Sequence, residues 1–184
     1  GITALGKKRL GETVPHYHTH RPWDGKIYMI TYDIPEKSHL KRDAFRYFLH
    51  KIHCKPYQES VWITPYNPRE IINNFIKNKN IPGMIIVSDT GSDGGIGEYT
   101  IQDLIVQIYK LEELNSKYDE FLKESKLGSR LVKKLIYKYL SVLDQDPQLP
   151  FKLIPKDFLG EKAHLRYQEL IGEYTDTIPR PRNV

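Results

Sequence analysis

The first half of the chain alternates between short β-rich runs and amphipathic stretches. Ile27 to Ile34 is mostly apolar, as expected of a central strand, and Pro35 ends it because proline cannot donate a ladder hydrogen bond. Ser38 is a suitable N-cap for a helix that reaches about His53 and gathers its apolar residues on one face. A second β-rich run follows at Tyr57 to Thr64.

A second helix and a third strand complete this half. Asn67 to Glu70 supplies an N-cap, a proline at the first helical position and an acid in the first turn. The apolar Ile71, Ile72, Phe75 and Ile76 make this helix amphipathic, and Met84 to Ser88 is a third apolar strand. If the run from Tyr57 to Thr64 bends into two strands, the pattern predicts an α+β fold, a ferredoxin-like α/β sandwich with the order β-α-β-β-α-β.

The spacing of apolar residues in the second half predicts helices. Asp89 to Gly97 is rich in glycine but lacks the Lys-Ser/Thr pair of a phosphate loop, so it predicts a flexible connector. Thr100 to Asp103 is typical of a helix start, and apolar stripes follow from Leu111 to Leu122, from Leu131 to Leu143, and along Ala163 to Ile171. The predicted division is a linker at 1–22, a ferredoxin-like domain at 23–90, a connector at 91–99, a helical domain at 100–175 and a tail at 176–184.

Composition narrows the class of protein. The 184 residues are 39% hydrophobic and 28% charged, which is typical of soluble globular domains and excludes disordered or fibrous chains. No apolar run approaches the ~20 residues that span a bilayer, so no membrane partner is expected. The one cysteine, Cys54, cannot form an internal disulfide and favours a reducing, cytoplasmic location. A net charge of +5 favours an acidic partner, most commonly nucleic acid, although it can also serve solubility alone.

Several motifs resemble the phenylacetate-operon repressor family, PaaX. They occur in the order of that family and read WDGK at Trp23–Lys26, YDIPE at Tyr32–Glu36, QESVWITP at Gln58–Pro65 and DPQLPFKLIPKDFLG at Asp146–Gly160. ITALGKKRL at Ile2–Leu10 is similar to the end of the family's winged-helix DNA reader, most of which this sequence would then lack. The resemblance implies a fragment of a DNA-binding transcriptional repressor that provides homodimerisation and that could bind a small-molecule effector.

Two consequences of this resemblance concern ligands. Lys7, Lys8 and Arg9 would add sequence-independent attraction to DNA phosphates next to the reader, although the same run also suits a solvated linker. Phe158 and Leu159 stand where the family signature has Trp-Pro. This departure argues against an acyl-coenzyme A, such as phenylacetyl-coenzyme A, as the effector.

The middle domain of the PaaX family is itself similar to CRISPR-associated protein two. There an aspartate that ends the first strand is proposed to share a divalent metal, Mg or Mn, across a dimer, and it matches Asp33 here. Ser60 matches a neighbour on the second strand. Asp33 is therefore the candidate metal ligand and catalytic residue, and a metal-dependent nuclease or a DNA-binding assembly module is the alternative function. Since an acid before Pro35 also suits a turn that accepts backbone N–H bonds, we favour a regulator without enzymatic activity.

Overall fold

The computed structural model describes residues 15–91, 94–95, 97–126 and 132–177, which form two compact units. The sheet unit consists of residues 21–110 and 149–154. The helical unit contains the described residues up to His20, residues 111–148 and those from Pro155 onward. None of the described helices is long and apolar enough to cross a bilayer.

The sheet unit has the predicted ferredoxin-like topology. Its elements are β1 (Lys26–Asp33), η1 (Glu36–Ser38), α2 (His39–Lys51), β2 (Lys55–Gln58), β3 (Val61–Thr64), α3 (Arg69–Lys79), β4 (Met84–Gly91) and α4 (Ile101–Ile108). The strands pair antiparallel in the order β2-β3-β1-β4. The run from Tyr57 to Thr64 does split into two strands, with Glu59 and Ser60 between them. The predicted β-α-β-β-α-β order is therefore confirmed.

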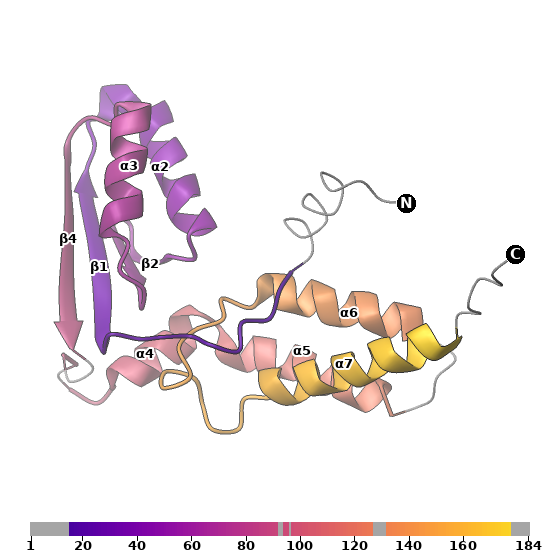
Figure 1. The fold of residues 1–184 in the computed structure, drawn as a ribbon. Helices are drawn as coiled ribbons and strands as arrows, with labels where there is room; N and C mark the ends of the chain where they lie inside the picture. Colours follow the sequence, from indigo (N-terminus) through magenta and orange to yellow (C-terminus); the bar gives the residue numbers. More distant parts are fainter. Residues whose placement is uncertain (1–14, 92–93, 96, 127–131, 178–184) are drawn as a thin grey trace, which may run out of the picture. The chain divides into compact units, whose positions relative to one another are not determined.

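One face of this sheet packs against α2 and α3. Figure 1 shows both helices on the same side of β1 and β4. Successive side chains of a strand point to opposite faces, and Ile30 and Tyr32 of β1 belong to the same buried cluster as Trp62 of β3. Between the helices, the rings of Phe48 and Phe75 stack with their centroids 3.9 Å apart. The even-numbered residues of β1 therefore form the core side of the sheet.

The capping residues and boundaries predicted for the helices and strands are confirmed only in part. Thr100 and Asp103 form the expected capping box at the start of α4. Ser38 precedes α2, but its side chain makes no capping hydrogen bond. Pro68 was predicted at the first helical position of α3 and instead occupies the N-cap, while the Asn67 Oδ1 accepts a hydrogen bond from the Arg69 amide at 3.2 Å. The strand predicted to end at Ser88 continues to Gly91 as part of β4.

The helix after the glycine-rich stretch, α4, packs within the sheet unit. Ile101 and Ile105 of α4 are buried, and the Tyr109 hydroxyl donates to the His53 carbonyl oxygen at 2.9 Å. Burial raises the pKa of Tyr109 far above its ordinary value, so the phenol stays protonated and remains a donor. These contacts fix α4 against the end of the sheet where β1 begins.

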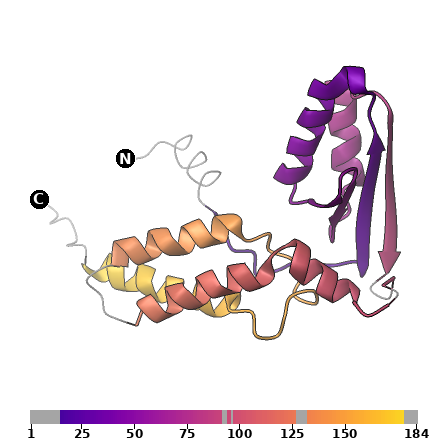
Figure 2. The ribbon, with the colours of Figure 1, turned by 180° about the vertical axis from the view of Figure 1, so that it is seen from behind.

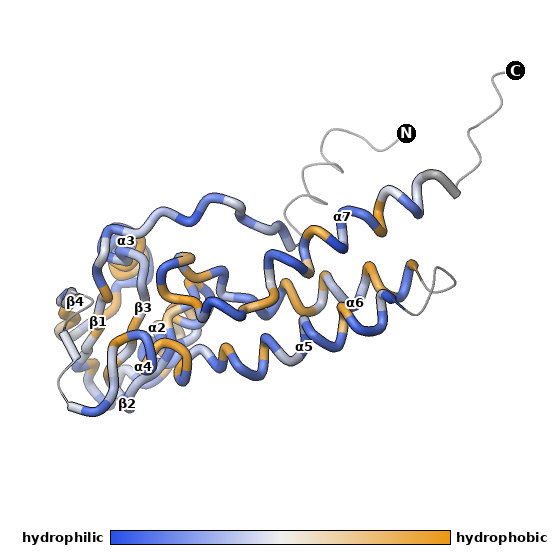
Figure 3. The backbone as a smooth tube through the Cα atoms, turned by 90° about the horizontal axis from the view of Figure 1, so that it is seen from below, coloured by the Kyte–Doolittle hydropathy of each residue, from blue (hydrophilic) through white to orange (hydrophobic). Residues whose placement is uncertain are grey.

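The helical unit consists of α5 (Leu111–Glu124), α6 (Val132–Gln145) and α7 (Gly160–Thr177). The three helices run side by side in both ribbon views (Figures 1 and 2). Hydrophobic and hydrophilic stretches alternate along α5 and α6, as expected of helices with one buried stripe (Figure 3). The predicted stripe residues Leu114, Leu135 and Tyr139 lie in one buried cluster together with Ala163 and Leu170 of α7.

Candidate functional site

The sheet face opposite α2 and α3, here called the open face, is the most distinctive surface of the sheet unit. Its members alternate along the strands with the core residues. They are Ile27, Met29, Thr31 and Asp33 of β1, Val61 and Ile63 of β3, and Met84, Ile86, Ser88 and Thr90 of β4. Strand register places Thr31 between Val61 and Ile86, so these three side chains form one row across the sheet.

The two ends of the open face differ in how well they are covered. At the end near α4, Ile27 and Ile63 are only 2% and 1% exposed. At the other end, Met84 and Ile86 are 65% and 50% exposed, although both are large and apolar. A contiguous apolar patch on a sheet face is typical of a surface that binds another protein.

Asp33 lies at this less covered end of the open face. Strand register pairs it with Met84, and its side chain is exposed. The turn explanation expected its carboxylate to accept backbone N–H bonds, but among the described residues no hydrogen bond or ion pair to that carboxylate is present. Its backbone is closely packed instead, because a Cβ on Gly83, which has a φ of +92°, would lie 2.0 Å from the Asp33 carbonyl oxygen.

Ser60 lies on the neighbouring strand connection, next to β1. Its carbonyl oxygen accepts a hydrogen bond from the Tyr32 amide at 3.4 Å, and its side chain is exposed. The structure thus brings Ser60 and Asp33 to the same end of the sheet. The other predicted contact residues, Lys7, Lys8 and Arg9, lie outside the described residues.

The donor set around Asp33 does not suit a metal site within one chain. A divalent cation such as Mg²⁺ or Mn²⁺ requires several oxygen ligands, usually including one or two carboxylates. Across residues 15–91, 94–95, 97–126 and 132–177, no group of three or more His, Cys, Asp or Glu side chains could hold a metal ion. Asp33 therefore offers one ligand, and further ligands would have to come from another molecule.

A charged cluster lies at the opposite end of β1 and was not predicted. Asp89 of β4 accepts from Arg69 at 2.6 Å and pairs with Lys26 at 2.8 Å. Hydrogen bonds from Lys26 and Arg69 lower the pKa of Asp89. The Arg69 guanidinium also lies 5.0 Å from the centre of the Tyr28 ring. Because each charge has a partner, the cluster connects the start of α3 to β1 and β4 and is structural.

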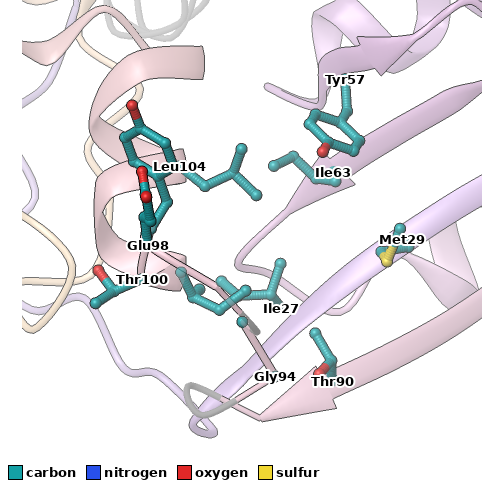
Figure 4. Close-up of a pocket in the computed structure, with 12 residues that line it drawn as sticks. Ile27, Met29, Tyr57, Ile63, Thr90, Gly94, Glu98, Thr100 and Leu104 are labelled. Atoms are coloured by element: carbon teal, nitrogen blue, oxygen red, sulfur yellow. The ribbon is translucent and has the colours of Figure 1, made fainter.

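A cavity of about 330 Å³ opens where α4 meets the open face (Figure 4). Its apolar wall includes Ile27, Met29 and Leu104, and its polar groups include Glu98 and Thr90. This volume lies in the range of small-molecule sites. No lysine or arginine lines the cavity among the described residues.

Cys54 offers no nucleophile to this surface. It is buried in the core of the sheet unit, and burial raises the pKa of its thiol to about 12. The thiol therefore stays protonated at neutral pH, and thiolates are the reactive form. Cys54 serves as a small apolar core residue.

Comparison with known families connects these observations. The PaaX protein central Cas2-like domain matches residues 20–99, and the PaaX-like protein C-terminal domain matches residues 129–178. The chain belongs to the PaaX family. The first match covers the ferredoxin-like topology and the whole open face, and the second covers α6 and α7.

The fold of this PaaX-family chain is also found in a solved structure. It is similar to the uncharacterized protein Rv0674 from Mycobacterium tuberculosis, with a TM-score of 0.65 at 16% sequence identity. The similarity covers 94% of this chain and 69% of that protein. At this identity the likeness concerns the fold alone. A comparison with curated proteins gave no match.

The signature that begins at Asp146 has a structural role in the helical unit of this PaaX-family chain. Asp146 is 5% exposed, and its Oδ2 accepts a hydrogen bond from the Tyr118 hydroxyl at 2.8 Å. Its Oδ1 accepts the Gln148 amide at 2.7 Å. Phe158, which replaces the tryptophan of the signature, meets the Tyr118 ring edge-on with the centroids 5.7 Å apart. Tyr118 therefore connects both ends of the signature to α5.

Proposed function

We propose that this chain provides the dimerisation part of a PaaX-like transcriptional repressor that binds DNA as a homodimer. Two copies pack through the less covered end of the open face, around Met84 and Ile86. The observation that supports this proposal is the exposure of these two large apolar side chains on a sheet face that no helix of the sheet unit covers at that end. A two-fold dimer would set the spacing of two DNA-reading domains on a palindromic operator.

The chemistry of the open face suits a self-complementary contact. A two-fold interface uses the same patch on both partners, so the patch cannot contain a dense field of one charge. The row of Val61, Thr31 and Ile86 is uncharged, and burial of apolar surface there contributes about 25 cal/mol per Å². Asp33 lies at the margin of this row, where its carboxylate can keep its hydration. A position at the rim of a protein interface accounts for the exposed Asp33 carboxylate without a metal ion. This favours a transcriptional regulator over a metal-dependent nuclease.

The cavity beside α4 offers a place for a small-molecule effector of the proposed repressor. Its lining is mostly apolar, with the Glu98 carboxylate among its polar groups. The phosphates of an acyl-coenzyme A would find no lysine or arginine among the described lining residues. The composition therefore supports an uncharged or cationic apolar effector at this position.

Substitution of Ile86 tests the proposed dimer. We expect wild type to sediment at twice the 21.6 kDa of one chain, and Ile86→Lys to weaken dimerisation by about tenfold or more. An ammonium group at the centre of the contact would lose its hydration, and the Asp33 carboxylate at the margin of the row would offset only part of that cost. Ile71→Lys is the matched control, because Ile71 is 46% exposed on α3, outside the open face.

Sedimentation equilibrium of the three proteins over a range of concentrations gives the dissociation constants. The proposal requires Ile71→Lys to remain as dimeric as wild type. A monomeric wild type, or equal loss of the dimer in both variants, would show that the open face is not the dimer interface.

A further inference from the structure

The positive charge of this chain is concentrated on one helix and the strand that follows it. Between Lys37 and Lys55 there are six basic residues and one acidic residue, Asp43, which equals the net charge of +5 of the whole chain. The remaining residues are therefore neutral overall. We refer to these basic residues together as the basic face of α2, although Lys37 belongs to η1 and Lys55 to β2. Helical spacing places Arg42 and Arg46 on one flank of α2 and Lys41 and Lys51 on the other.

These charges are poorly compensated. Among the described residues, the one ion pair found for the basic face joins Arg42 to Glu36 at 4.0 Å, and the Glu36 side chain is 94% exposed. The Lys41 ammonium donates to the Asn80 carbonyl oxygen at 2.7 Å, which leaves its charge in place. By contrast, two cations of the helical unit, Lys138 and Arg166, each pair with two glutamates. The basic face therefore retains charge that an outside partner can neutralise.

Lys55 extends the basic face beyond the end of α2, because β2 begins four residues after Lys51. Desolvation lowers the pKa of His50, and the positive charges of Lys55 and Arg46 lower it further. Lys55 belongs to β2 and Arg46 to α2, so cations from two elements act on the same imidazole. Because β2 is an edge strand, nothing else in the sheet covers this flank.

The spacing of the charges suits a polyanion with regular phosphates. Arg42 and Arg46 are four residues apart, which is a rise of about 6 Å along the helix. From His39 to Lys51 the axis of α2 extends roughly 18 Å. Duplex DNA carries one negative charge per about 1.7 Å of its axis, so several phosphates fall within that length.

We propose that the basic face of α2 contacts the phosphate backbone of duplex DNA independently of sequence. This places a DNA contact within the sheet unit itself, separate from any DNA-reading domain and from the open face. It adds to the proposed repressor function but does not depend on the dimer. Sedimentation reports on the dimer and DNA binding reports on the basic face, so the two proposals fail independently.

Fluorescence anisotropy with a labelled duplex of about 30 base pairs and random sequence tests the contact, at KCl concentrations from roughly 50 to 250 mM. The test protein is the full 184-residue chain with Arg42→Gln, Arg46→Gln and Lys51→Gln. A matched control carries Lys134→Gln, Lys156→Gln and Lys162→Gln, three exposed positions of the helical unit. Both variants lose the same net charge and keep Lys7, Lys8 and Arg9.

We expect the test variant to bind at least tenfold more weakly, and the slope of log K against log[KCl] to fall by about 2 to 3, since each phosphate contact contributes about 0.9. The control should stay within about twofold of wild type with the same slope. Far-UV circular dichroism establishes whether both triple variants are folded. If the test variant is unfolded, the single variant Arg46→Gln replaces it, and we expect that variant to lower the slope by about 1.

Three results would overturn the proposal. The first is a wild type that does not bind DNA at the lowest salt concentration. The second is equal weakening of binding by both triple variants, which would reduce the effect to net charge. The third result uses vesicles of which about a third of the lipid is phosphatidylserine. If wild type binds these vesicles but not DNA, and the test variant loses that binding, the basic face with its exposed Leu40 and Tyr47 is a membrane-surface contact instead.

Discussion

Replacing Trp62 with alanine should destabilise the sheet unit by about 3–5 kcal/mol. Trp62 is fully buried on the core side of β3 and belongs to one cluster with Ile30, Phe45 and Leu49. Its removal leaves a cavity at the centre of the sheet, which the strands on both sides prevent from collapsing. This is the largest loss of stability that we expect from a single substitution in the sheet unit.

Phenylalanine at the same position should cost much less, about 1–2 kcal/mol. The Trp62 Nε1 is buried and has no hydrogen-bond partner among the described residues, so the wild-type side chain already loses hydration without compensation. Removal of this N–H offsets part of the lost packing. If Trp62→Phe lowered the free energy of unfolding as much as Trp62→Ala does, the unpaired indole N–H would not be a destabilising group in wild type.

Urea unfolding measured by fluorescence gives both values. The chain has two tryptophans, so Trp23 is the remaining probe in each variant. Trp23 lies in the same unit, and its Nε1 donates to the Lys26 carbonyl oxygen at 2.8 Å. Its emission therefore reports the unfolding of the sheet unit itself.

Removing the Tyr118 hydroxyl should destabilise the helical unit by about 2–3 kcal/mol. In Tyr118→Phe, the buried Asp146 Oδ2 loses the donor that lies 2.8 Å away in wild type. Hydrogen bonds to charged groups contribute about 1.5–3 kcal/mol, and a buried carboxylate oxygen without a donor carries a desolvation cost. The ring itself is kept, so packing against Phe158 should change little.

Tyr137→Phe is the matched control in the same unit, because Tyr137 is 73% exposed on α6 and its substitution should change stability by less than about 0.5 kcal/mol. Far-UV circular dichroism follows the unfolding of α5, α6 and α7. Equal stability of the two variants would show that the Tyr118–Asp146 hydrogen bond contributes nothing.

The fold of the sheet unit was predictable because its turn residues and its apolar runs indicate the same order of strands and helices. Turn residues separate the apolar runs, and Glu59 and Ser60 interrupt the longest run where the sandwich requires a turn between two strands. The packing of α4 could not be read in this way. Its apolar stripe resembles those of α5 and α6, and the contact that holds it joins Tyr109 to His53, residues distant in the sequence.

The open face was also hidden in the sequence. Both faces of β1 are mostly apolar, with Ile27 and Met29 on one side and Ile30 on the other, so alternation does not show which side the helices cover. Motif resemblance identified Asp33 as the candidate site residue. It could not show that Asp33 borders the uncharged row that contains the exposed Ile86, because that row is formed by three strands.

The central claim is that two copies meet through the open face, and the two methionines of the chain test it most directly. Met29 and Met84 both belong to that face, so selective ¹³C labelling of methionine methyl groups gives NMR signals from the open face alone. On dilution from dimer to monomer, the account predicts that the Met84 signal shifts in step with the mass measured by sedimentation. In Ile86→Lys the same transition should occur at concentrations at least tenfold higher. A Met84 signal that stays constant while the mass halves would contradict the account and place the dimer interface elsewhere.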